Sequence, residues 1–298
     1  MKPAYLLLLL GITLAWGLHF SVIRVTVDDV PPIAYVAVRM ALVALILTPV
    51  RRWVPGRMRT ILLAGACFGG LNYVFMFWGL KLTTASVSAV VIESYVPIAT
   101  VFSVLFLGER VGVPRIVGMV IALLGVAIIA TGESGSTGSA NLPLGALMIV
   151  TAATFEAAGA IFVKKLGDVP PLTLLSWFGV VGAVVTGLLS LLFEDGQAAV
   201  LVSPERYTVL AALAYSVLVA SIFAHASYYF LLQRAPVSQL AGSGLLASVF
   251  AVMFGVLLLD EPLTGRFLIG GAMTLAGVAV ILLRQQKRAA RETPEALP

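Results

Sequence analysis

The sequence predicts an all-α integral membrane protein with ten transmembrane helices. Composition is the first indication: of 298 residues, 60% are hydrophobic and 11% are charged, and the mean hydropathy is +1.05. A soluble domain has too little interior to bury so much apolar surface. The second indication is a series of apolar runs of about 20 residues, the length of a helix that crosses a bilayer. The third is a duplication of the whole pattern.

Ten apolar runs of this length follow one another along the chain. They cover approximately residues 4–23, 32–50, 60–80, 84–107, 113–131, 142–163, 171–193, 207–232, 236–259 and 265–283. Helices are expected because a lipid-facing strand would alternate apolar and polar residues, which these runs do not. The first run follows Lys2 and so resembles a secretory signal. However, Trp16 stands where signal cleavage needs small residues, and we expect the run to remain as a helix.

The second half of the chain repeats the first. Pairs that match 152 residues apart include Ser86 with Ser238, Leu107 with Leu259, Glu109 with Glu261, Gly118 with Gly270 and Gly125 with Gly277. The turn at residues 30–32 (VPP) recurs 139 residues later, at 169–171. Each repeat holds five helices, an odd number, so the second repeat must enter the membrane from the opposite side. We therefore expect two inverted repeats, residues 1–131 and 142–283, followed by a cytoplasmic tail, 284–298.

Basic residues predict the orientation of the chain. With the N-terminus inside, fourteen of the nineteen Lys and Arg residues fall on the inner side of the membrane, and Arg39 falls within a helix. The four on the outer side are Arg24, Lys81, Arg206 and Arg266. Cytoplasmic loops carry an excess of Lys and Arg, so both termini are expected in the cytoplasm. We expect the protein in the bacterial inner membrane, where its net charge of +5 reflects orientation and not nucleic-acid binding.

No motif of a soluble enzyme is present. The sequence has no Walker loop, no GxSxG nucleophile and no HExxH pair. Cys67 is the only cysteine, which excludes an intrachain disulfide, and the two histidines are far apart, so no metal site is expected. We therefore expect no enzymatic activity and no cofactor. The expected partners are the lipid bilayer and a small-molecule substrate, with no obligatory protein partner.

Glu93 and Pro97 lie one turn apart in the fourth predicted helix. They have no counterpart in the second repeat, because Leu245 and Val249 occupy the matching positions. Proline lacks an amide hydrogen and its ring crowds the carbonyl of Glu93, so we expect the helix to bend there and to serve as a gate. Lipid penalises buried charge by about 2.5–3.5 kcal/mol on insertion scales, which favours a substrate or proton site at Glu93. The alternative is a neutral carboxylic acid that bonds a neighbouring helix.

Other polar and aromatic residues inside the apolar runs are candidates for a cavity wall. Glu156 is either a substrate-binding residue or a structural partner, for example of Arg39. Arg39 lies near the outer end of its helix, and its side chain is expected to reach the interface. His225 shares a helical face with Ser221 and Tyr228, although the histidines could instead bond backbone carbonyls. The remaining candidates are Trp16, His19, Asn72, Met76, Trp78, Tyr95 and Ser243.

Three short motifs give the chain a family resemblance. The repeats contain LGER at 107–110 and LDEP at 259–262, each followed by a Gly-rich helix, and the first helix contains AWG at 15–17. With these motifs the chain resembles the drug/metabolite transporter superfamily, in its ten-helix EamA-type branch, and looks most like the YddG-type aromatic amino-acid exporters. The resemblance covers almost the whole chain. It implies an inner group of helices 1, 3, 4, 6, 8 and 9, with helices 5 and 10 at the back.

The resemblance and the inverted repeats together imply alternating access around a site near the membrane midplane. We expect a secondary transporter that exports aromatic and other hydrophobic amino acids or related small metabolites. An exporter of other small metabolites or of cationic drugs is the alternative of the same class. A channel or an intramembrane enzyme is the alternative of another class, but the helices show neither a continuous polar face nor a paired catalytic set.

Overall fold

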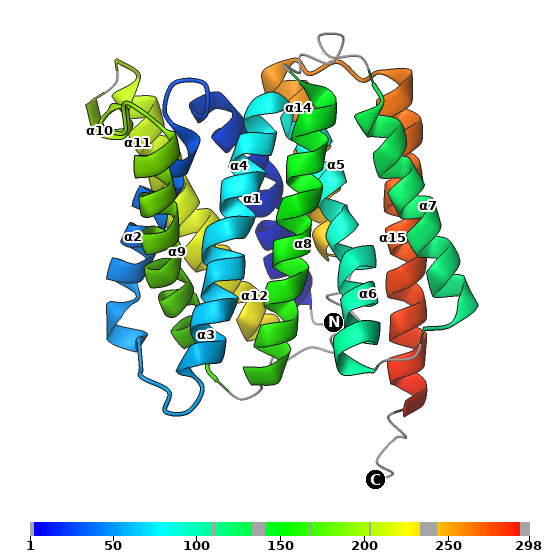
Figure 1. Cartoon of the computed structure of the whole chain (residues 1–298). Coiled ribbons are helices and arrows are strands. Elements are labelled where there is room, and N and C mark those ends of the chain that lie inside the picture. Colours follow the sequence, from blue (N-terminus) through cyan, green and yellow to red (C-terminus); the bar gives the residue numbers. More distant parts are fainter. Residues whose placement is uncertain are drawn as a thin grey trace.

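The computed structural model describes residues 3–108, 111–132, 141–166, 169–202, 204–232 and 243–292, and all regular structure in these ranges is helical (Figure 1). Eight of the described helices are long and apolar enough to cross a membrane, and two shorter apolar ones, Pro32–Ile46 and Ser243–Leu259, complete the ten predicted segments. The prediction of a multi-pass helical membrane protein is therefore confirmed. The predicted features that lie outside the described residues are Glu109, Arg110, Ser238, linker residues 133–140 and tail residues 293–298.

The first half of the chain forms five membrane segments. Its elements are α1 (Pro3–Thr26), α2 (Pro32–Ile46), η1 (Thr48–Val50), α3 (Met58–Gly65), the π-helix η2 (Ala66–Leu71), α4 (Asn72–Leu82), α5 (Ala85–Val91), the 3-10 turn η3 (Ile92–Ser94), α6 (Tyr95–Leu107) and α7 (Val113–Ala130). The third segment joins α3, η2 and α4, and the fourth joins α5, η3 and α6. Local chemistry sets their ends: Thr84 Oγ1 accepts a hydrogen bond from Val87 N at 3.2 Å, and Gly108 ends α6 at a φ of 66°.

The second half of the chain also forms five membrane segments. Its elements are α8 (Leu142–Leu166), α9 (Pro171–Phe193), α10 (Ala199–Val202), α11 (Arg206–Ala214), the π-helix η4 (Tyr215–Phe223), α12 (Ala224–Leu232), α14 (Ser243–Leu259) and α15 (Gly265–Glu292). Prolines at the first turn begin both α2 and α9, where their fixed φ suits a helix start. The short helix α10 lies between the apolar runs 171–193 and 207–232, where no helix was predicted from the sequence.

Two helix pairs form the edges of the bundle. In Figure 1, α2 packs on α9 along the left edge and α7 on α15 along the right. Glycines let α7 and α15 approach closely: a Cβ atom added at Gly125 would lie 2.5 Å from the Gly270 carbonyl oxygen, and one added at Gly277 would lie 2.5 Å from that of Gly118. These are the glycines that the repeat comparison matches, so both copies supply the same close contact.

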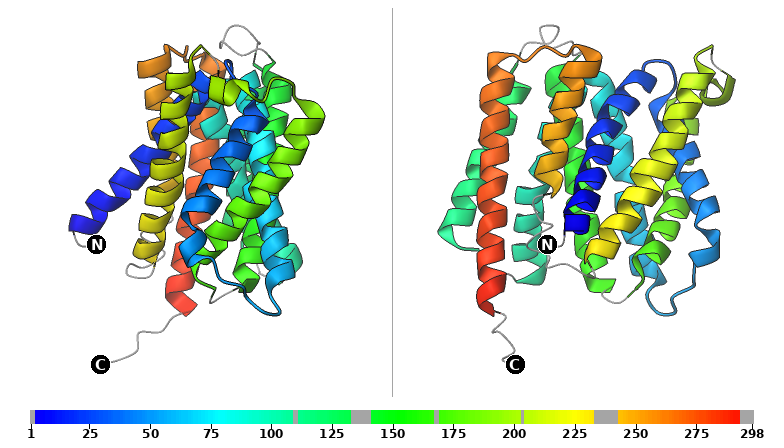
Figure 2. Two further views of the ribbon diagram at one scale, coloured as in Figure 1. Left: turned by 90° about the vertical axis from the view of Figure 1, so that its left-hand side faces the viewer. Right: turned by 180° about the vertical axis from the view of Figure 1, so that it is seen from behind.

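The remaining segments fill the space between the edges. Helix α1 packs on α14 and α12, and α4 packs on α8. Gly17 allows the α1–α14 contact, since an added Cβ would lie 2.9 Å from the Ala247 carbonyl oxygen, and Gly79 allows the α4–α8 contact in the same way with Gly145. Figure 2 shows that α1 begins and α15 ends toward the same end of the bundle.

Candidate functional site

A cavity of about 470 Å³ lies among the inner segments, between α1, α4, η3, α6, α8, α12 and α14. Ten of the eleven predicted substrate-binding residues line it: Trp16, His19, Asn72, Met76, Glu93, Tyr95, Glu156, His225, Tyr228 and Ser243. The eleventh, Trp78, does not. Both halves of the chain therefore contribute polar and aromatic groups to one space inside the bundle.

Glu93 occupies the irregular turn η3, between α5 and α6. The regular α-helix is thus interrupted at the residue where Pro97 predicts a bend. The side chain is 8% exposed, and its Oε1 accepts a hydrogen bond from Ser248 Oγ of α14 at 2.7 Å. This is the interhelical bond that the packing alternative expects, yet Glu93 also lines the cavity. A Cβ added at Gly244 would lie 3.5 Å from Glu93 Oε1 and 3.8 Å from Oε2, so the missing side chain leaves space beside the carboxyl group.

Glu156 enters the cavity from α8. Asn72 Nδ2, at the start of α4, donates to the Ala152 carbonyl oxygen at 3.0 Å and to Glu156 Oε2 at 3.3 Å. One amide therefore positions the carboxyl group and ties α4 to α8. Arg39 makes no ion pair with Glu156, since the only ion pair among the described residues joins Arg24 and Asp28.

Arg39 does not extend to the interface, contrary to our expectation from its place in α2. Its side chain is 1% exposed, and its Nε and Nη2 donate to Ser221 Oγ at 3.2 and 2.9 Å. The guanidinium carbon also lies 4.8 Å from the centre of the Tyr73 ring, which is a cation–π contact. Local position suggested an easy route to the interface, but these tertiary partners hold the side chain inside the protein.

His19 is held by a serine and not by a backbone carbonyl. Its Nε2 lies 3.0 Å from Ser216 Oγ, and the hydroxyl of Tyr35 lies 2.8 Å from the same oxygen. Ser216 belongs to η4, whereas His19 and Tyr35 belong to α1 and α2. This hydroxyl therefore links α1, α2 and η4.

The π-helix η4 also supplies the backbone groups that orient the aromatic wall. His225 Nδ1 lies 3.0 Å from the carbonyl oxygens of both Ala220 and Ser221, as the carbonyl interpretation expects. Trp16 Nε1 donates to the Ala220 carbonyl at 3.3 Å. The Trp16 ring lies 5.4 Å from the His225 ring, edge to face, and 5.5 Å from the Tyr228 ring. The carbonyl groups of η4 and the ring contacts thus hold Trp16, His225 and Tyr228 together. Irregular π-helical turns are frequent at functional sites.

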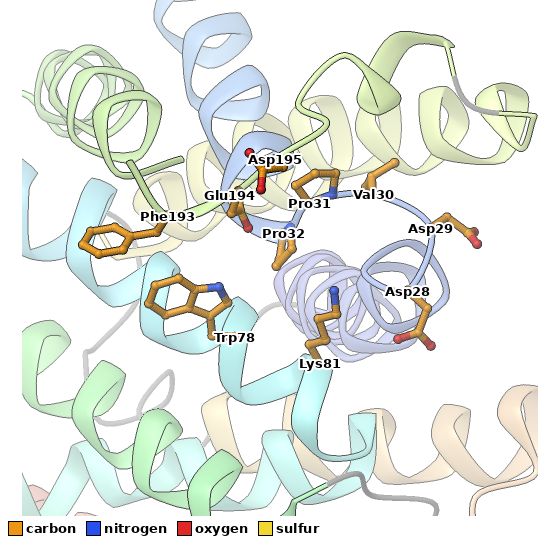
Figure 3. A pocket seen from close by; sticks show the side chains of 10 residues that line it. All are labelled: Asp28, Asp29, Val30, Pro31, Pro32, Trp78, Lys81, Phe193, Glu194 and Asp195. Carbon is orange, nitrogen blue, oxygen red and sulfur yellow. The ribbon is translucent and has the colours of Figure 1, made fainter. Parts of the chain in front are cut away.

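Trp78 lies in a separate pocket of about 440 Å³, which is lined by the C-terminal part of α4, whereas Asn72 at the start of the same helix lines the inner cavity (Figure 3). In Figure 3, Trp78 and Lys81 extend from α4 toward Pro32. The Trp78 ring lies 6.4 Å from that of Phe193. Glu194, beside them, accepts hydrogen bonds from the first free amides of α2, Ile33 N and Ala34 N, both at 2.9 Å. This pocket therefore has a structural carboxylate and an aromatic pair, and it is distinct from the inner cavity.

Gly244 and Ser248 are cavity residues that we did not predict. They lie four residues apart on α14 and so share a face of that helix. Ser248 donates a hydrogen bond to the carboxyl group of Glu93, and Gly244, which has no side chain, leaves space beside the same group. The signal that could have identified them is this spacing of small residues within an otherwise apolar helix.

Comparison with known proteins identifies the family of the chain. The sequence model of the EamA-like transporter family matches residues 3–131 and 143–283. The chain belongs to this family. As an EamA-like transporter it is a membrane transport protein and not an enzyme, which agrees with the absence of enzyme motifs from its sequence.

Curated relatives of this EamA-like transporter have similar length. A "probable amino-acid metabolite efflux pump" of Salmonella typhimurium is 28% identical over 290 residues, covering 94% of each chain. A protein of the same description from Escherichia coli is 28% identical over 283 residues, covering 92% of this chain and 93% of the relative. A solved structure described as "crystal structure of protein" covers 95% of this chain and 99% of its own, with a TM-score of 0.63 and 19% identity, which supports the fold alone.

Proposed function

We propose that this EamA-like transporter is a secondary exporter of aromatic and other hydrophobic amino acids or related small metabolites, working by alternating access. The observation that carries the proposal is the cavity to which both halves contribute aromatic and carboxyl groups. Its volume of about 470 Å³ lies within the range of small-molecule sites, roughly 300–1,000 Å³. The names of the two bacterial efflux pumps, at 28% identity, agree with export of amino-acid metabolites.

Two inverted repeats, residues 1–131 and 142–283, are part of the same proposal. Three observations support them: η2 and η4 fall in the third segment of each half, matching glycines pack α7 on α15, and α1 begins at the end of the bundle where α15 ends. The distribution of basic residues favours cytoplasmic termini and a cytoplasmic tail in a bacterial inner membrane.

Cysteine labelling tests this orientation. In a Cys67→Ala background, Asn141→Cys should react with a membrane-impermeant maleimide in intact cells, because Asn141 is exposed near the proposed outer end. The exposed Arg59→Cys should react only after the cells are opened. The reverse pattern would overturn the orientation.

The gate is proposed at the junction of η3 and α6, where Glu93 and Pro97 lie one turn apart. A helix that already changes its hydrogen-bonding pattern can swing one half with little loss of backbone bonding. Glu93, on the cavity wall, would sense the substrate at the same point.

Counterflow distinguishes a carrier from the alternatives. Proteoliposomes loaded with unlabelled tryptophan should accumulate external labelled tryptophan faster than unloaded ones, because only a carrier shows trans-stimulation. Empty liposomes are the control, and a panel of twenty amino acids defines the substrate range. Flux without trans-stimulation would indicate a channel, and no flux of any amino acid would contradict amino-acid export.

A further inference from the structure

In its described part, the inner cavity contains two carboxyl groups and two histidines, His19 and His225, but no permanently charged basic group. Among its described lining residues there are two carboxyl groups, Glu93 and Glu156, and neither lysine nor arginine. A free amino acid presents both an ammonium and a carboxylate group to its site. Apart from the two histidines, the described lining offers ionisable partners for the ammonium group only.

Each carboxyl group has one oxygen available to a ligand. Glu93 Oε1 is bonded to Ser248, and Glu156 Oε2 is bonded to Asn72. The described residues provide no hydrogen-bond partner for Glu93 Oε2 or Glu156 Oε1. The two groups enter the same cavity from η3 and from α8, and these two elements pack against each other. Two acceptor oxygens on different helices can share the several N–H donors of one ammonium group.

The nearest buried cation is already committed elsewhere. Arg39 does not line the cavity, and it donates two hydrogen bonds to Ser221, although its Nη1 has no hydrogen-bond partner. Tyr73, whose ring receives the guanidinium group, is the residue that lines the cavity at this point. Arg39 is therefore not among the residues that a carboxylate in the cavity would contact directly.

The other polar groups of the wall include hydroxyl groups, which can donate or accept a hydrogen bond. A carbonyl oxygen only accepts hydrogen bonds, so the contacts of His225 Nδ1 with two carbonyls place the proton of the neutral ring on that nitrogen. The faces of Trp16, Tyr95 and Tyr228 can attract a cation and also accommodate an apolar or aromatic substituent.

We infer that this transporter takes small organic amines, with the ammonium group held between Glu93 and Glu156 and the apolar part against Trp16 and Tyr228, and that it requires no free carboxylate on its substrate. Amines and the amides or esters of amino acids are the chemical class that fits. The inference rests on the proposed transport function, since it assigns the ligand of the same cavity.

A series of indoles tests the inference, because its members share the aromatic ring and differ in the charged groups of the side chain. Tryptamine and tryptophanamide carry the ammonium group alone, tryptophan carries both groups, and indole-3-propionate carries the carboxylate alone. Competition against labelled tryptamine in counterflow, and ligand-induced shifts of Tm in detergent, should rank the two ammonium-only compounds at least about ten-fold above indole-3-propionate. Equal or stronger binding of indole-3-propionate would overturn the inference.

Substitutions of the two glutamates test whether these residues cause the preference for amines. Glu93→Gln and Glu156→Gln should each remove most of the preference for tryptamine over indole-3-propionate, whereas Glu205→Gln, at an exposed position, should leave it unchanged. If a Gln variant does not fold, the ligand series on the wild-type protein still decides the question. Ligand-induced Tm shifts without trans-stimulated flux would refute the transport proposal, and trans-stimulated flux that favours the acid would refute only the amine assignment.

Discussion

Gly244→Ala should weaken substrate binding without weakening the fold. The added methyl group would lie 3.5 Å from Glu93 Oε1 and 3.8 Å from Oε2, which are ordinary contact distances, so no atom has to move. It would nevertheless occupy the space through which an ammonium group reaches that carboxyl group. Losing one hydrogen bond to a charged group costs about 1.5–3 kcal/mol. The half-saturating concentration of tryptamine in counterflow should therefore rise at least about ten-fold.

Gly271→Ala is the matched control for this change. Its added Cβ would lie 3.8 Å from Val90 Cγ1, a similar contact with no carboxyl group nearby. Both substitutions replace a helical glycine by alanine, which favours the helix by up to about 1 kcal/mol. Both variants should thus keep or slightly raise Tm, and only Gly244→Ala should lose affinity. Wild-type affinity in a folded Gly244→Ala protein, or an equal loss in Gly271→Ala, would refute the reasoning.

Three further changes probe packing, capping and the gate. Gly125→Ala would place a Cβ 2.5 Å from the Gly270 carbonyl oxygen and should lower the free energy of unfolding by about 1–3 kcal/mol. Gly11→Ala is the control, because an added Cβ there would have nothing within 4 Å. Equal Tm values for the two variants would contradict the close contact. The Glu261 carboxylate caps α5 by accepting hydrogen bonds from its first two amides at 2.6 and 2.8 Å. Glu261→Gln replaces one of these acceptor oxygens by an amide group and should lower Tm by roughly 2–8 °C, for a loss of about 1–2 kcal/mol. An unchanged Tm would show that this cap contributes little to stability. Pro97→Ala restores an amide donor, so it should raise Tm and slow counterflow turnover at unchanged half-saturation; unchanged turnover would move the gate elsewhere.

The ten segments could be predicted because the bilayer imposes length and polarity on each helix separately. Glu93 and Glu156 could be proposed for the same reason, since a carboxyl group in an apolar run needs a cavity or a partner. Neither inference needs knowledge of neighbouring helices.

The positions that could not be predicted from the sequence depend on contacts between neighbouring helices. Trp78 has the same local signature as Trp16, but packing against Phe193 places it in the separate pocket beside Pro32. The buried position of Arg39 depends on Ser221 and Tyr73, which are distant in sequence. Local patterns therefore identified which residues are unusual, and tertiary contacts decided where two of them lie.

The π-helix η2 sets the register of the site. A wide turn holds more residues than the regular α-helical turn, so the chain entering α4 at Asn72 is rotated relative to an uninterrupted helix. Deleting one residue from Ala66–Leu71 would still leave a helix that spans the membrane. It would, however, turn everything beyond it by about 100°, the angle of one residue in a helix of 3.6 residues per turn. The side chains of Asn72 and Met76 would then point away from the cavity, although neither residue had been substituted. Relatives whose segment is one residue shorter or longer would therefore have different binding sites even where the lining residues align.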